Sequence, residues 1–237
     1  MTTSGARRVT RRVVPLAVRR PLGIGLYRLR IKTRLGLHGV LGQLPVLAAR
    51  DFVYSDRYYD KIDPLQAPLY ARFADALVRL RAPENAVDVG CGSGLMLTKL
   101  AERGVRVLGL DGSRAAVRRA RKTIPAVRAN LEHGVPMVGR FDISLSIEVA
   151  EHLRPKAGPR LVEGLTRLSD TVVFTAAPPG QGGTSHINLR PRSYWVALFA
   201  SQGFIESRLR EELLVAIADI REPQFLHRNL MVFEREL

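Results

Sequence analysis

The rhythm of hydrophobic and polar positions changes along this chain of 237 residues. From about residue 84 onward, short apolar runs alternate with segments in which apolar residues recur every three or four positions. The short runs are typical of buried strands, and the longer period is typical of helices. The predicted strands are 86–90, 106–110, 127–129, 141–147, 171–176, 204–209 and 229–234.

The segments between these strands predict helices. Ser113 is a good N-terminal cap for one of them, and Gly203 ends another. The predicted helices are 95–103, 114–122, 158–169 and 192–202. Such alternation predicts the α/β class, with a mostly parallel, doubly wound sheet. Ligands of these sheets bind at the carboxyl ends of the strands, near the switch in strand order.

Charge divides the chain into two parts. The formal net charge is +15, but residues 1–50 hold 11 of the 37 basic side chains and no acid, which leaves +4 for the rest. We therefore expect a basic arm over 1–50 and one domain over 51–237. The arm has three interpretations: a solvated extension, an amphipathic surface that meets anionic lipid or a partner, or a segment that neutralises nucleic-acid phosphates.

Composition excludes several classes of protein. With 46% hydrophobic and 25% charged residues, the chain is an ordinary globule and not a disordered one. A single cysteine, Cys91, excludes a disulfide framework and a cysteine-built zinc site. No apolar run reaches the roughly 18 residues of a membrane span, and Arg19 and Arg20 interrupt the run that resembles a signal peptide. We expect a cytoplasmic protein.

A glycine motif follows the first predicted strand. Gly90, Gly92 and Gly94 alternate with other residues, Asp88 precedes them, and Asp111 ends the next strand. Glycine permits a tight turn and a close approach of a ligand to the backbone. The spacing differs from the G-x-G-x-x-G of dinucleotide-binding loops, and a carboxylate at position 111 suits the two hydroxyls of a ribose.

Residues 87–94, Asp111 and residues 141–153 together resemble the class I S-adenosylmethionine-dependent methyltransferases. The resemblance extends over roughly residues 50–237. It implies a Rossmann-like, doubly wound, seven-stranded sheet with an antiparallel last strand, to which the basic arm is an N-terminal extension.

The resemblance also implies S-adenosyl-L-methionine as the cofactor. In that family the glycine loop packs against the methionine moiety and the ribose, and the acid after the second strand holds the ribose hydroxyls. Asn130 stands where the family usually has an aspartate near the adenine, so the match is weaker there. The implied cofactor residues are Asp88, Gly90, Cys91, Gly92, Gly94, Asp111, Gly112, Asn130, Leu131 and Ile147.

A second polar group, Glu148, Glu151 and His152, follows the strand predicted at 141–147, and His186 follows the next strand. If a helical turn begins at Glu148, the first three side chains converge. Carboxylate and imidazole ligands suit Mg, Mn, Fe or Zn. The box is similar to that of the small-RNA 2′-O-methyltransferases and the ubiquinone-pathway O-methyltransferases, where it binds a divalent metal.

Three interpretations of this group stay open. The first is a metal site of Glu148, Glu151, His152 and His186. The second is acid–base catalysis, with His186 or His152 as general base and Glu148 beside them. The third is a purely structural role.

Two further segments flank the predicted site. Tyr54, Tyr58 and Tyr59 precede the first predicted strand and either cap the cofactor or pack against the domain. The Gly- and Pro-rich loop 177–188 lies where a lid or an acceptor contact is expected.

The sequence therefore predicts an enzyme that transfers a methyl group to a hydroxyl of a small molecule, such as a natural-product or sugar intermediate, with an amine as second choice. One alternative is an RNA ribose 2′-O-methyltransferase with a divalent metal, suggested by the basic arm. An alternative from another class is a non-catalytic cofactor-binding protein. The acceptor and the oligomeric state are not indicated by the sequence.

Overall fold

The computed structural model describes residues 54–183 and 185–236, so the predicted arm over 1–50 lies outside the described residues. In the described part, seven strands form one sheet in the order β3-β2-β1-β4-β5-β7-β6. Strands β1 to β5 are parallel, and β7 is antiparallel to both β5 and β6. The predicted doubly wound sheet with an antiparallel last strand is confirmed. The strands are β1 (Asn85–Val89), β2 (Arg106–Asp111), β3 (Ala126–Arg128), β4 (Ile143–Ser146), β5 (Thr171–Phe174), β6 (Phe204–Glu206) and β7 (Met231–Arg235).

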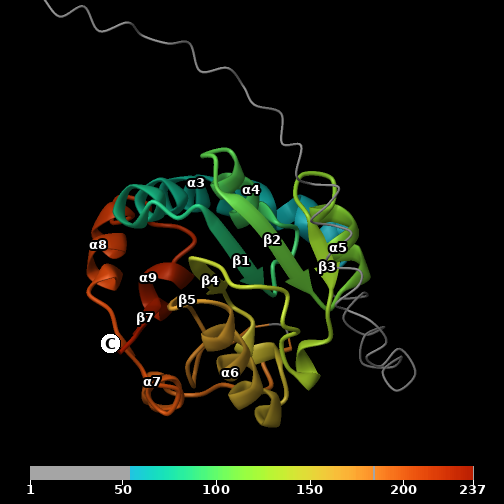
Figure 1. Cartoon of the computed structure of the whole chain (residues 1–237). Helices are drawn as coiled ribbons and strands as arrows, with labels where there is room; N and C mark the ends of the chain where they lie inside the picture. Colours follow the sequence, from blue (N-terminus) through green and yellow to red (C-terminus); the bar gives the residue numbers. More distant parts are fainter. Residues whose placement is uncertain (1–53, 184, 237) are drawn as a thin grey trace, which may run out of the picture.

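Helices cover both faces of this sheet (Figure 1). One face carries α3 (Asp56–Arg81), α4 (Leu95–Ala101), α5 (Arg114–Ala120), α8 (Leu209–Ala216) and α9 (Phe225–Asn229). The other face carries α6 (Gly158–Leu168) and α7 (Arg192–Ala200). Three single 3-10 turns complete the described part: η1 (Leu131–His133), η2 (Ala150–His152) and η3 (Pro155–Ala157).

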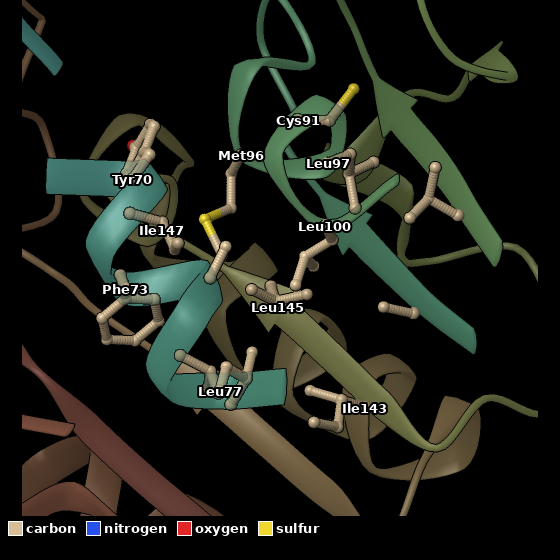
Figure 2. Close-up of a cluster of buried hydrophobic side chains, with 14 of the residues drawn as sticks. Tyr70, Phe73, Leu77, Cys91, Met96, Leu97, Leu100, Ile143, Leu145 and Ile147 are labelled. Carbon is tan, nitrogen blue, oxygen red and sulfur yellow. The ribbon is translucent and has the colours of Figure 1, made fainter. Parts of the chain in front are cut away.

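Strand side chains enter two separate cores. Ile143 and Leu145 of β4 point into the core beneath α3 and α4 (Figure 2). Phe174 of β5 packs on the other face, with its ring 5.1 Å from that of Trp195. Because both faces are covered, β2 and β5 read as nearly continuous apolar runs. Strand β4 alternates between apolar residues and serines, and all four of its residues are buried.

The longest helix in the described residues, α3, was not predicted. Leu69, Phe73 and Leu77 lie on its buried face at helical spacing. Pro64 and Pro68 lie inside the helix and remove two backbone donors, which makes its first half resemble a loop in sequence. The predicted strand 204–209 is also too long, because β6 ends at Glu206 and α8 begins at Leu209.

Candidate active site

A cavity of about 190 Å³ lies at the carboxyl ends of β1, β2 and β4, where the strand order reverses. Most of the predicted cofactor residues line it; Gly94 and Asn130 do not. The lining residues that were predicted are Asp88, Gly90, Cys91, Gly92, Asp111, Gly112, Leu131 and Ile147.

The loop between β1 and α4 depends on its glycines. Gly90, Gly92 and Gly94 have backbone φ angles of 93°, 53° and 80°, which residues other than glycine rarely adopt. A Cβ on Gly90 would lie 2.2 Å from a methyl carbon of Val149. Gly94 is the N-terminal cap of α4, so its part is to turn the chain into the helix.

Asp111 fixes this loop against the end of β2. One carboxylate oxygen accepts a hydrogen bond from the Gly92 amide at 2.9 Å, and the other accepts from the Ser113 amide at 2.8 Å. Each carboxylate oxygen has a second lone pair. Asp111 therefore holds the loop against the end of β2, and it lines the cavity.

Asp88 lies in a drier environment at the base of the cavity. It is 3% exposed, and its Oδ1 has no hydrogen-bond partner among the described residues. Burial, and then the charge of Asp111, raise the pKa of Asp88 to about 8. Asp88 lines the cavity, and a carboxylate with one unpartnered oxygen fits an ammonium group, which the methionine moiety of S-adenosylmethionine carries.

The turn after β3 differs from the prediction. The side chain of Asn130 accepts a hydrogen bond from the Glu132 amide at 3.2 Å and caps η1. Its neighbour Leu131 is 3% exposed and lines the cavity. This turn therefore contributes an apolar side chain to the cavity, while Asn130 is used in the local structure.

Helix α3 forms the wall opposite the glycine loop. Tyr54, just before it, and Tyr58 and Tyr59 on it line the cavity. The ring of Tyr59 lies over Gly92, 3.3 Å from the position of a Cβ there. Burial and the nearby Asp111 raise the pKa of Tyr59, so its phenol stays neutral. Sequence reasoning missed the other lining residues of this helix because it missed the helix: Ile62, Asp63, Gln66 and Tyr70.

Glu148 reaches the cavity from a strained position. Its φ is 54°, and its backbone amide donates to the Thr175 hydroxyl at 2.7 Å. Its Oε1 accepts from the side-chain amide of Asn229 at 3.0 Å. Asn229 ends α9, 81 positions along the chain, and no sequence pattern connects it to the site.

The two predicted histidines lie together, with ring centres 4.9 Å apart. His152 lines the cavity. The Nδ1 of His152 is 3.3 Å from the Ser185 carbonyl, and that of His186 is 3.2 Å from the Gln181 carbonyl. Because a carbonyl only accepts, each Nδ1 carries the proton and each Nε2 is the basic nitrogen.

Ligand atoms of Glu151, His152 and His186 lie within 4.8 Å of one another. Glu148 does not join them, which corrects the predicted four-residue convergence: the turn is a 3-10 turn beginning at Ala150, and Glu148 bonds to Asn229. Glu151 is fully buried. Burial, and then Glu148, raise the pKa of Glu151.

Comparisons with known proteins show similarity to methyltransferases in sequence and in fold. Residues 87–169 match the family model described as "Methyltransferase domain". The fold resembles the magnesium protoporphyrin IX methyltransferase of Synechocystis with bound SAH, with a TM-score of 0.57 and 14% identity over 80% of this chain and 99% of that one. Residues 87–169 therefore resemble a methyltransferase domain, and the described fold is that of the class I S-adenosylmethionine-dependent methyltransferases.

Two curated methyltransferases are similar in sequence. The ubiquinone biosynthesis O-methyltransferase of Acinetobacter baylyi is 29% identical over 144 residues, 57% of each chain. The magnesium-protoporphyrin O-methyltransferase of Rhodobacter capsulatus is 31% identical over 123 residues, 49% of this chain and 53% of that one. The chain thus matches little more than half the length of these relatives. The family model covers the stretch from β1 to the end of α6, so α3 and Asn229 lie outside it.

Proposed function

We propose that this methyltransferase acts on a hydroxyl group of a small molecule, such as a natural-product or sugar intermediate, with an amine as second choice. One observation carries the proposal: Asp88, Asp111 and the imidazole of His152 line the same cavity. Two acids there suit the cofactor, and the imidazole beside them suits a general base. The names of the similar O-methyltransferases support a hydroxyl acceptor.

Bound S-adenosylmethionine would supply an electrophilic methyl group on a positively charged sulfur. Asp111 would accept hydrogen bonds from its ribose hydroxyls, and Asp88 would pair with its ammonium. In the transfer that the cofactor would supply, the acceptor oxygen would bond to the methyl carbon, and the electron pair of the carbon–sulfur bond would stay on sulfur. The Nε2 of His152 takes the hydroxyl proton. The carbonyl of Ser185 holds the other ring proton and so keeps this nitrogen basic.

The test is release of S-adenosylhomocysteine by the full chain supplied with S-adenosylmethionine and panels of phenols, sugars and amines. We expect turnover with a hydroxyl acceptor. His152→Ala should lower kcat by about 10²–10⁴, the usual contribution of a general base. The control is His133→Ala, an exposed histidine outside the cavity. Turnover of amines alone, or equal rates for both variants, would contradict the assignment.

A divalent metal is the second candidate, favoured by the Glu151, His152 and His186 cluster. Both histidines present a basic Nε2, but Glu151 must lose its proton to bind a cation. Binding of Mn²⁺ alone, followed by electron paramagnetic resonance, should then strengthen as the pH rises and disappear in His186→Ala. Full activity in EDTA, with no Mn²⁺ bound, would exclude a required metal and weaken the RNA ribose alternative.

Other expectations stay predictions. Cofactor binding without turnover of any acceptor would favour a non-catalytic protein. Binding of RNA or anionic lipid by the basic residues of 1–50 should fall steeply with salt. Among the described residues, no helix could span a membrane. The cytoplasmic location is not tested by this finding.

A further inference from the structure

Helix α3 has two unlike halves. After Pro68 its apolar face is buried in the core, with Phe73 and Leu77 fully covered (Figure 2). Before Pro64, Tyr59 is the one buried residue of the helix. The first half therefore has little apolar packing to hold it, although it forms a wall of the cavity.

Polar contacts hold this first half instead. Asp63 accepts from the Ser93 hydroxyl of the glycine loop at 2.8 Å and from the Arg119 guanidinium of α5 at 3.2 Å. Arg119 also donates to Asp60 at 2.6 Å. The first turns of α3, in blue, lie beside α5 in Figure 1.

Asp63 differs from the other acids of this segment. Its side chain is 18% exposed and that of Arg119 is 22% exposed, whereas Asp60 is 67% exposed. Exposed ion pairs contribute little, but a half-buried pair that also bonds to a hydroxyl is held more firmly. The guanidinium carbon of Arg119 lies 6.0 Å from the ring centre of Tyr59. Arg119 therefore contacts both Asp63 and the ring that lies over Gly92.

The two prolines separate this segment from the rest of the helix. Pro64 and Pro68 have no backbone N–H, so the hydrogen bonds they would donate toward the preceding turn are missing. The helix can therefore bend at this point more easily than elsewhere. Release of the Asp63 contacts would free the first turns without breaking the packed second half.

We propose that residues 56–63 form a flap hinged at Pro64 and Pro68, and that Asp63 is a positioning residue that holds Tyr59 over the cofactor site. The inference rests on the proposed function, because it takes the cavity to bind S-adenosylmethionine. The flap retains the cofactor and opens for its exchange.

Binding kinetics of S-adenosylhomocysteine to the full chain test this proposal. We expect Asp63→Asn to speed dissociation by about ten-fold or more, the scale of a lost charge-assisted contact, without slowing association. Tyr59→Ala should do the same, and Tyr59→Phe should retain slow dissociation because the ring is kept. Adding Tyr59→Ala to Asp63→Asn should have little further effect, since Asp63 acts through Tyr59.

The control is Asp75→Asn. Asp75 lies on the packed half of α3 and pairs with Arg103 at 2.5 Å, so its loss breaks an ion pair of the same helix away from the flap. It should leave both rate constants near those of the unsubstituted chain. Equally slow dissociation from Asp63→Asn and Asp75→Asn would overturn the proposed flap. Slower association with Asp63→Asn would also overturn it, because that result indicates a damaged binding site. Failure of the unsubstituted chain to bind would instead reject the proposed function.

Discussion

Asp88 and Asp111 show how position gives two identical side chains different tasks. Asp111 ends β2 and accepts hydrogen bonds from two backbone amides, which stabilise its charge. Asp88 lies within β1, is buried, and has an oxygen with no partner among the described residues. The first suits neutral hydroxyl donors, and the second suits a cation.

Asp111→Ala should weaken binding of S-adenosylmethionine about ten-fold or more, because a hydrogen bond to a charged group contributes about 1.5–3 kcal/mol. Equilibrium dialysis with labelled cofactor measures this. The control is Asp142→Ala, since Asp142 also accepts from two backbone amides, those of Glu84 and Asn85, but does not line the cavity. Equal affinities for the two variants would refute the role of Asp111.

Asp88→Asn should make the ligand-free protein more stable at pH 8 and leave it nearly unchanged at pH 4. The pKa of Asp88 is about 8 in the folded protein, against roughly 3.9 unfolded. As the pH rises between these two pKa values, Asp88 loses its proton in the unfolded chain but keeps it in the folded protein. Its ionisation therefore lowers the free energy of unfolding. We expect a gain of about 2 kcal/mol or more at pH 8. Urea unfolding at both pH values measures it, and an equal effect at both would contradict the buried acid.

At the scale of the element, the loop from β1 to α4 is shaped by contacts as well as by backbone angles. Gly90→Ala should destabilise the protein by about 2–4 kcal/mol through both backbone strain and the contact with Val149. Gly104 has a similar φ of 86° but no atom within 4 Å of an added Cβ, so Gly104→Ala should cost only about 1 kcal/mol. Thermal and urea unfolding compare the two. Equal losses would show that the contact with Val149 is unimportant.

The sequence predicted the elements whose patterns are local. Apolar runs located the central strands, and the glycine motif with Asp111 predicted residues that line the cavity. Helix α3 was missed because Pro64 and Pro68 hide the helical spacing of its buried residues. Asn229 was missed because its bond to Glu148 depends on the return of β7 between β5 and β6, which no local pattern records.

At the scale of the whole molecule, the site is assembled from distant parts of the chain. The strand ends provide the acids, the turn at Ala150–His152 provides one imidazole, and α3 lines the cavity. The second imidazole, that of His186, comes from the loop after β5. The net charge of +15 is mostly a property of residues 1–50, which lie outside the described residues. The remaining domain, at +4, gives no electrostatic reason for a polyanionic acceptor.

The most direct test of this account is a calorimetric titration of the full chain with S-adenosylmethionine and with S-adenosylhomocysteine. We predict saturable binding of one molecule per chain, competition between the two ligands, and a higher unfolding temperature in the presence of either. Absence of heat, of competition and of any shift in unfolding temperature at saturating ligand would contradict the central claim that this cavity binds the cofactor.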